Sequence, residues 1–372
     1  MKIGCPTELK DNENRVGLTP NTARTYVNAG HSVFVQKGAG AGSGIADEDY
    51  ISAGATVLDA AEQVWSCADM IVKVKEPMPE EYGFMREGQI IYTYFHFAAN
   101  EQLTKACLER KIIAMAYETV EEKGSLPLLK PMSEVAGRMA PIMGAYYLAK
   151  TQDGTGLLPM GVTGVAPAEV LVIGGGVVGT LAAKAAAGYG ARVTILDINL
   201  ARLERLGEIM EPNVLPLYSD QMNLESCLKA ADIVIGAVLI PGAVTPKLVT
   251  RAHIKSMKPG SVFVDVAIDQ GGCCETSRPT THSDPVYVVD GVIHYCVGNM
   301  PGAYSRTSTF ALNNATIRYG LPLADLGAEK ACRKNAGLKK GMNMYKGKIT
   351  FKAVAEAFGL LEHYADVDTV LG

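Results

Sequence analysis

The stretch EVLVIGGGVVG, residues 169–179, decides the expected fold of this chain. Its first five residues form an apolar run typical of a buried strand, and Gly174, Gly176 and Gly179 follow in the spacing G-x-G-x-x-G. In the order strand, loop, helix, the first glycine makes a tight turn, the second lets the backbone approach a pyrophosphate, and the third lets helix and strand pack closely. Val177 and Val178 begin the helix, whose N-terminus favours an anion. The stretch therefore predicts a dinucleotide-binding unit.

A carboxylate stands where such a unit needs one for its cofactor. Asp197 ends the next expected strand, RVTILD, eighteen residues after Gly179. A carboxylate there accepts hydrogen bonds from the ribose hydroxyls of NAD and repels the extra phosphate of NADP. The nearby Arg192, Arg202 and Arg205 keep NADP open, because a guanidinium can hold a 2′-phosphate. The structural alternative is a glycine turn in a fold that binds nothing, with Asp197 merely exposed.

The rest of the chain predicts an α/β protein of two Rossmann-like doubly wound domains with a cleft between them. Its 372 residues exceed what one core usually supports, and apolar runs alternate with helical segments. A long helix over 133–151, with a bend at Pro141, separates the halves, and a helix over 305–319 leads back. We expect a discontinuous substrate domain, 1–130 plus 305–372, and an NAD-binding domain, 131–304. Strands are expected at 2–5, 32–36, 69–75, 89–97, 112–117, 169–173, 192–197, 214–217, 232–238 and 261–266, and the other helices at 20–28, 101–110, 178–188, 200–209, 221–231 and 246–257.

Composition excludes several classes of function. A net charge of −4 argues against nucleic acid or an anionic membrane as partner. The most apolar stretch, 170–183, is short and contains four glycines, so we expect it to be core. The first residues contain no apolar signal segment, and the eight scattered cysteines show no zinc spacing, so we expect a cytoplasmic protein without a metal. Cys273 and Cys274 are either a redox pair or two reduced thiols in a loop.

Four residues form a candidate set for hydride-transfer chemistry on a 2-amino or 2-oxo acid. Arg15 lies in a polar loop, Lys75 ends the strand MIVKVK, His96 lies in YTYFHFAAN, and Asp269 follows VFVDVAI. Such chemistry needs an arginine to hold the substrate carboxylate, a lysine to polarise the carbonyl, a histidine to move protons, and a carboxylate facing the nicotinamide. Each also has a structural alternative: a loop cation, a surface lysine, a half-buried histidine, and a turn or cap residue.

Several segments of the chain together resemble the alanine dehydrogenases. They are PTE and ENRVGLTP, VKVKEP, YFHFAA, PMSEVAGRMA, GGGVVG, VDVAIDQGG and SRPTTHSDP, which run in order along nearly the whole chain. The resemblance implies NAD-dependent interconversion of L-alanine with pyruvate and ammonium by a homohexamer. It implies that Arg15 and Lys75 bind the substrate and that His96 and Asp269 are the acid/base pair. For the cofactor it points to Ser133, Asp197, Arg202, Ser219, Val238, Leu239, Val266, Ala267, Ile268, Asp269, Arg278, Val297, Gly298, Asn299 and Met300.

Three other functions remain open. A nucleotide-binding subunit of a proton-pumping transhydrogenase shares the two-domain plan, but it has no need of a lysine and a histidine directed at a substrate. A non-catalytic NAD-sensing module would keep the glycine loop and Asp197 without the other four residues. A saccharopine-forming dehydrogenase predicts a longer substrate and a roomier pocket.

Overall fold

The structure, a computed structural model, describes residues 1–238 and 245–372. It divides into two compact units: unit 1 comprises Met1–Met132 and Gly302–Gly372, and unit 2 comprises Ser133–Pro301. The division falls inside the helices α5 (Lys130–Tyr147) and η7 (Met300–Tyr304), two or three residues from the expected boundaries. Because both helices continue through the division, no break in the sequence pattern marks it.

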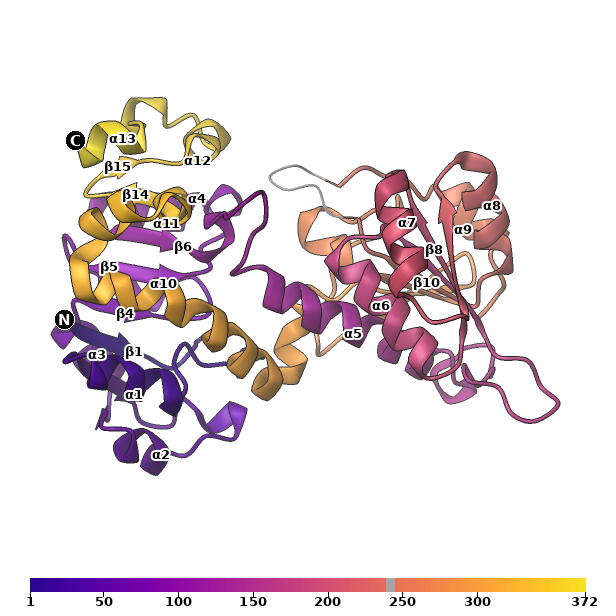
Figure 1. Cartoon of the computed structure of the whole chain (residues 1–372), viewed down its shortest axis with the longest axis horizontal. Coiled ribbons are helices and arrows are strands. Elements are labelled where there is room, and N and C mark those ends of the chain that lie inside the picture. Colours follow the sequence, from indigo (N-terminus) through magenta and orange to yellow (C-terminus); the bar gives the residue numbers. More distant parts are fainter. Residues whose placement is uncertain (239–244) are drawn as a thin grey trace. The chain divides into compact units, whose positions relative to one another are not determined.

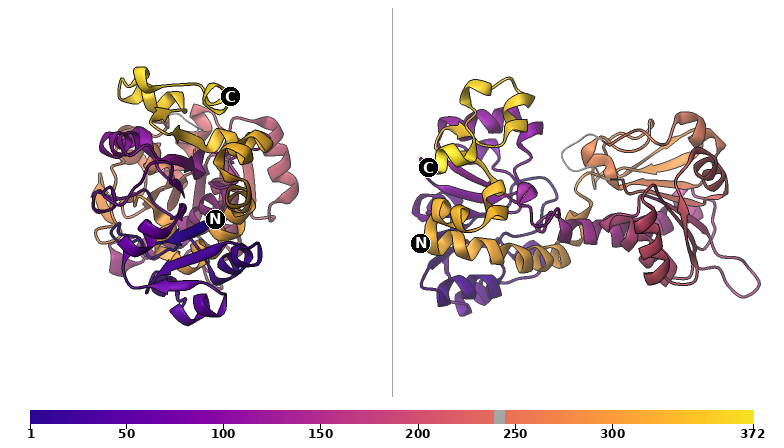
Figure 2. Two further views of the ribbon diagram at one scale, coloured as in Figure 1. Left: turned by 90° about the vertical axis from the view of Figure 1, so that its left-hand side faces the viewer. Right: turned by 45° about the horizontal axis from the view of Figure 1, so that its top comes forward.

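Unit 1 is built on an eight-stranded sheet in the order β15-β14-β6-β5-β4-β1-β2-β3. The strands from β6 to β3 are all parallel, whereas β14 pairs antiparallel with both β6 and β15. The helices α12 and α13 lie at the β14–β15 edge (Figures 1 and 2). The elements are β1 (Lys2–Cys5), α1 (Pro20–Asn28), β2 (Ser32–Gln36), α2 (Asp47–Ser52), β3 (Thr56–Leu58), α3 (Ala61–Cys67), β4 (Met70–Val72), β5 (Ile90–Thr93), α4 (Glu101–Glu109), β6 (Ile113–Ala116), α10 (Ser305–Lys334), α11 (Ala336–Gly341), β14 (Met342–Tyr345), β15 (Lys348–Ile349), α12 (Lys352–Ala357) and α13 (Val367–Leu371).

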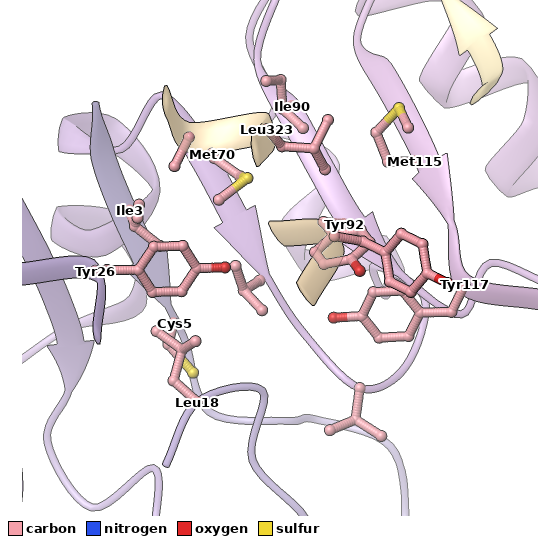
Figure 3. Packing of buried hydrophobic residues seen from close by; sticks show 14 of the residues in the cluster. Ile3, Cys5, Leu18, Tyr26, Met70, Ile90, Tyr92, Met115, Tyr117 and Leu323 are labelled. Atoms are coloured by element: carbon pink, nitrogen blue, oxygen red, sulfur yellow. The ribbon is translucent and has the colours of Figure 1, made fainter. Parts of the chain in front are cut away.

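Helices cover both faces of this sheet. Successive side chains of each strand point to opposite sides, so each strand contributes apolar residues to both faces. On one face Tyr26 of α1 and Leu323 of α10 pack among residues of β1, β4 and β5 (Figure 3). On the other face Trp65 of α3 and Leu103 of α4 form a second cluster. Each such large apolar side chain contributes about 1.5–3 kcal/mol through burial, so the strand ends are held on a rigid support.

Unit 2 has a seven-stranded sheet in the order β12-β13-β11-β10-β7-β8-β9. Apart from the antiparallel edge strand β12, this is the order 3-2-1-4-5-6 of a dinucleotide-binding fold, with β7 as its first strand. The expectation of an α/β protein is therefore confirmed. The elements are β7 (Glu169–Ile173), α6 (Val177–Gly188), β8 (Arg192–Asp197), α7 (Leu200–Ile209), β9 (Val214–Tyr218), α8 (Gln221–Ala230), β10 (Ile233–Gly236), α9 (Arg251–Ser256), β11 (Val262–Asp265), η6 (Val266–Gln270), β12 (Val286–Val289) and β13 (Val292–Tyr295).

The core of unit 2 also has two sides. Val170 and Val172 of β7 pack with α5, α6 and α7, whereas Leu171 and Ile173 pack with α8 and α9. Figure 1 shows α6 and α7 on the same side of this sheet. Helices on both faces of a mostly parallel sheet leave the carboxyl ends of the strands as the place where ligands bind.

Three expected helices differ from those observed. The helix expected over 133–151 is α5, which begins at Lys130 and ends at Tyr147. The helix expected over 246–257 is only α9, because Thr250 caps it through its hydroxyl and Val249 donates its backbone N–H to the carbonyl of Cys273 instead. The helix expected over 305–319 continues to Lys334 as α10, across a break in helical geometry at Gly327. No helix in the described ranges is long and apolar enough to cross a membrane.

Candidate active site

Three of the four candidate residues follow the carboxyl ends of neighbouring strands in the sheet of unit 1. Arg15 lies in the loop after β1, Lys75 follows β4, and His96 follows β5. The strands β5, β4 and β1 are neighbours and parallel, so their carboxyl ends point the same way. The fold thus gathers a guanidinium, an ammonium and an imidazole that lie far apart in the sequence.

Arg15 is buried and forms an ion pair with Glu13. Its Nε donates to Glu13 Oε1 at 2.6 Å and its Nη2 to Oε2 at 2.5 Å, while the two side chains are only 2% and 0% exposed. Burial alone would lower the pKa of Arg15, but the hydrogen bonds and charge of Glu13 raise the pKa above its usual value. Arg15 Nη1 lies 3.0 Å from the Sδ of Met132. The guanidinium is therefore charged and fixed in orientation.

Lys75 is positioned through its backbone by a buried carboxylate. Glu8 accepts hydrogen bonds from the backbone N–H groups of Val74, at 2.6 Å, and Lys75, at 3.3 Å. Glu8 also lies 3.3 Å from the Nζ of Lys73, which in turn lies 3.0 Å from Glu81. Burial raises the pKa of Glu8 to about 7 although Lys73 opposes the rise. Because these amides bond to a side chain, β4 ends at Val72 rather than at Lys75 as expected.

His96 has a conformation that few non-glycine residues adopt. Its φ of 51° and ψ of 37° are left-handed, and the backbone N–H donates to Glu118 Oε1 at 2.7 Å. The N–H of Phe95 donates to the same carboxylate, so β5 ends at Thr93, short of the expected Phe97. The imidazole is 46% exposed, and its Nδ1 lies 3.5 Å from Glu76 Oε2. The hydrogen bonds of Glu118 to the backbone thus hold His96 in this conformation, with its imidazole open to solvent.

Glu76 is ionised beside His96. Burial would raise its pKa, but His96 and Lys10 together hold the pKa of this carboxyl well below its usual range. Lys10 Nζ lies 2.7 Å from Glu76 Oε1. Within unit 1, Glu76 thus lies beside the imidazole of His96, whereas Asp269, expected as the partner of His96, belongs to unit 2.

The glycine loop of unit 2 has the geometry that a pyrophosphate needs. Gly174 has a φ of 100°, and a Cβ on Gly179 would lie 1.8 Å from the carbonyl oxygen of Gly174. Gly176 precedes α6 without a side chain that could cap it, and a Cβ there would meet open space. The first N–H groups of α6, on Val177 and Val178, are therefore the natural donors to an anion. These residues fit a dinucleotide.

Asp197 lies at the end of β8 against the same loop. It is 7% exposed; its Oδ2 accepts from the N–H of Gly175 at 2.8 Å and from Arg202 Nη1 at 3.1 Å, and Oδ1 accepts from the N–H of Asn199. Burial would raise the pKa of Asp197, but these donors lower it, so the carboxylate is ionised. Arg202 is engaged with Asp197 in this structure, which weakens the argument for a 2′-phosphate site.

The other expected cofactor residues of unit 2 lie on several elements. Asp269 is exposed in η6, and its Oδ2 accepts from the N–H of Asn299 at 3.4 Å. Val238 follows β10, and its side chain approaches Gly174. Leu239 lies outside the described residues. Of the remainder, Ser133 (in α5), Ser219 (after β9), Val266 (in η6) and Gly298 are half-buried, Ala267, Ile268, Val297 and Met300 are buried, and Arg278 is exposed.

The part of the chain that the structure describes contains neither a metal centre nor a disulfide. Residues 1–238 and 245–372 contain no group of three or more His, Cys, Asp or Glu side chains placed to hold a metal ion. Cys273 and Cys274 are both buried and free, which favours two reduced thiols over a redox pair.

Comparisons with known proteins show the family of this chain. The family description "Alanine dehydrogenase/PNT, N-terminal domain" matches residues 4–136, and "Alanine dehydrogenase/PNT, C-terminal domain" matches residues 140–352. This chain belongs to the alanine dehydrogenase/PNT family. Two relatives within the family are both named alanine dehydrogenase. The protein of Methanococcus maripaludis is 54% identical over 97% of both chains, and that of Halomonas elongata is 52% identical over 100% of both.

Two solved structures have the same fold as this chain. A structure titled L-alanine dehydrogenase matches with a TM-score of 0.94 and 48% identity, covering 96% of this chain and 99% of its own. A transhydrogenase from Sinorhizobium meliloti matches with a TM-score of 0.81 and 26% identity, covering 95% of this chain and 100% of its own. The higher identity favours the dehydrogenase branch of the family over the transhydrogenase branch.

Sequence reasoning missed four carboxylates of this site. Glu13 and Glu76 lie beside candidate residues in segments that carry the resemblance, so their position next to Arg15 and Lys75 was the available signal. Glu8 and Glu118 act on backbone amides 66 and 22 residues away. Nothing in a local pattern reveals contacts over such distances.

Proposed function

We propose that this protein catalyses the reversible, NAD-dependent oxidative deamination of L-alanine to pyruvate and ammonium. The observation that carries the proposal is that Arg15, Lys75 and His96 follow the carboxyl ends of neighbouring strands. Over its full length the chain is also about half identical to proteins named alanine dehydrogenase. A module that only binds a nucleotide would not need an arginine, a lysine and a histidine placed together in this way.

We assign the substrate's carboxylate to Arg15 and its 2-oxo oxygen to Lys75. Glu13 occupies the Nε–Nη2 edge of Arg15, so the proposed place for the carboxylate is at Nη1. There it would compete with the Sδ of Met132, a much weaker acceptor than a carboxylate. An ammonium at Lys75 stabilises negative charge that develops on the carbonyl oxygen.

We assign the proton transfers to His96 and Asp269. Deamination requires a proton to leave the substrate ammonium, water to add at Cα, and ammonia to depart, so the catalytic group must both accept and donate. An imidazole serves both roles near neutral pH. The NAD⁺ that unit 2 would hold would supply the acceptor for the hydride that leaves Cα. Glu76 keeps a negative charge beside Nδ1 of His96, which orients the ring so that Nε2 serves the substrate.

We propose that unit 2 binds NAD in preference to NADP. The loop Gly174–Gly179 would receive the pyrophosphate on the first turn of α6, and the ionised Asp197 would accept hydrogen bonds from the ribose hydroxyls. The other proposed contacts are Ser133, Arg202, Ser219, Val238, Leu239, Val266, Ala267, Ile268, Asp269, Arg278, Val297, Gly298, Asn299 and Met300.

We further propose that the enzyme is a homo-oligomer, a hexamer by family resemblance, and acts in the cytoplasm. Supporting the first point, the segment 142–165 of unit 2 exposes six large apolar side chains, which a subunit contact would bury. They are Ile142, Tyr146, Leu158, Met160, Val162 and Val165. The eight unpaired cysteines support a reducing compartment.

The test is a spectrophotometric assay of NADH formation with L-alanine, L-serine, L-lysine or no amino acid. We expect strong activity with L-alanine, weaker activity with L-serine and none with L-lysine. A parallel reaction with NADH and NADP, without an amino acid, measures transhydrogenation. Hydride exchange there without turnover of L-alanine would overturn the proposal.

A further inference from the structure

Three aromatic rings in unit 2 stack in one row across neighbouring strands. Phe263 of β11 pairs with His294 of β13, and His294 pairs with Tyr287 of β12. Residues that pair in register point to the same face of a sheet, so their rings meet. The ring centroids of Phe263 and His294 are 5.7 Å apart, those of His294 and Tyr287 are 5.2 Å apart, and both pairs are stacked. Strand pairing thus builds a rigid aromatic row that ends at the sheet edge.

Arg278 covers the outer end of this row. Its guanidinium carbon lies 4.2 Å from the centroid of the Tyr287 ring, a distance at which a cation is attracted to the ring face. Phe263 and His294 are fully buried, Tyr287 is half-buried, and Arg278 is exposed. The row therefore runs from the core to one exposed cation.

The hydroxyl of Tyr287 also fixes the backbone that carries Arg278. It accepts from the N–H of Arg278 at 2.7 Å and donates to the carbonyl of Thr276 at 2.9 Å. The Thr276 hydroxyl contacts Nε2 of His294 at 2.7 Å, and Ser277 donates to the buried Asp265 at 2.6 Å. Every residue of the segment Thr276–Arg278 is thus held by the strands beneath it, and Tyr287 holds both of its ends.

We infer that Tyr287 is a positioning residue for cofactor binding, which acts by holding Arg278 in the orientation that meets the bound dinucleotide. This inference rests on the proposed function, since it takes Arg278 as a contact of NAD. An exposed arginine has many rotamers, and fixing it before binding removes an entropic cost of binding. The ring of Tyr287 orients the guanidinium of Arg278, and the hydroxyl of Tyr287 fixes the backbone of Arg278.

The test is a double-mutant cycle on NADH affinity, measured by fluorescence titration of NADH with the full chain. Arg278→Ala should weaken NADH binding about tenfold. Tyr287→Leu should weaken it about three- to tenfold, and Tyr287→Phe, which keeps the ring, about two- to threefold. In the Arg278→Ala background, Tyr287→Leu should add less than about twofold, because the residue through which it acts is already gone. Tyr189→Phe removes a hydroxyl elsewhere in unit 2, near the carbonyl of Pro141, and should leave affinity unchanged.

The outcomes separate this inference from the proposed function. Unchanged NADH affinity in Tyr287→Leu, or an equal loss in both backgrounds, overturns the positioning role, since the second result means a general structural effect. If Tyr287→Leu does not fold, the same cycle with Tyr287→Phe decides the question. Failure of the wild-type protein to bind NADH overturns the proposed function itself, and an unaltered affinity in Arg278→Ala overturns the assignment of that contact and the inference with it.

Discussion

Replacement of Glu8 by glutamine should change how the stability of unit 1 depends on pH. Glu8 is buried, its carboxylate binds the amides of Val74 and Lys75, and burial raises its pKa from 4.5 to about 7. The folded state therefore binds this proton more tightly than the unfolded state does. The resulting contribution to stability is fully present below about pH 4.5 and is lost as the pH rises through about 7. The side chain of glutamine does not titrate, so the Glu8→Gln variant lacks this pH-dependent contribution.

The size of the effect follows from the pKa. A rise from 4.5 to about 7 corresponds to about 3 kcal/mol. The unfolding free energy of wild type minus that of Glu8→Gln should thus fall by about 3 kcal/mol between about pH 4.5 and pH 7.5. The amide of glutamine also faces the donors Lys73 Nζ and Lys75 N–H, which lowers the stability of the variant at every pH. Only the change of this free-energy difference with pH tests the raised pKa of Glu8.

The single tryptophan provides the assay. Trp65 is the only tryptophan in the chain and is fully buried in α3, so its fluorescence during urea unfolding reports on unit 1. Curves at several pH values for wild type and Glu8→Gln give the difference directly. Glu80→Gln, at an exposed glutamate of η2 (Pro79–Glu81), controls for the loss of one negative charge. Curves for wild type and Glu8→Gln that stay parallel from about pH 4.5 to pH 7.5 would refute the reasoning.

Three further predictions concern the proposed site. Asp197→Ala should raise the KM for NAD and relax discrimination against NADP; an unchanged ratio of kcat/KM for the two cofactors would remove Asp197 from the cofactor site. Arg15→Ala and Lys75→Ala should each lower kcat/KM for pyruvate by at least about a hundredfold while NADH affinity stays nearly intact, and an equal loss of NADH binding would indicate a structural role. His96→Gln should lower kcat about 10²–10⁴-fold, because an amide can hydrogen-bond but cannot accept and release the transferred proton. If the variant keeps more than about a tenth of the activity with the same pH profile, His96 only orients the substrate.

The elements around the glycine loop were predictable from sequence because their signals are local. β7, β8 and α7 begin and end at the expected residues, since an apolar run and its flanking glycine or cap are read within a few positions. The hairpin of β12 and β13 was missed although Asp290 and Gly291, both with positive φ, form a typical two-residue hairpin turn.

The environment of the candidate residues was not predictable, because it depends on pairing across distant segments. Glu8 and Lys73 are 65 residues apart, and their contact exists only once β1 and β4 are neighbours. The carboxylates Glu8 and Glu118 capture backbone amides that a propensity argument assigns to strands, so β4 and β5 end early. The residue types of the site could be chosen from sequence, but the groups that orient them could not.

The discontinuity of unit 1 has a consequence for biosynthesis. β6 pairs with β14, and the partners Ile113 and Tyr345 are 232 residues apart. At about 5–20 residues per second, the ribosome needs roughly 10–50 s to make the second partner after the first. Unit 2 is continuous, so its sheet can form during this interval, while β6 has β5 on one side and still lacks β14 on the other. A nascent chain in this state exposes a strand edge, which is a site where chaperones or other chains bind.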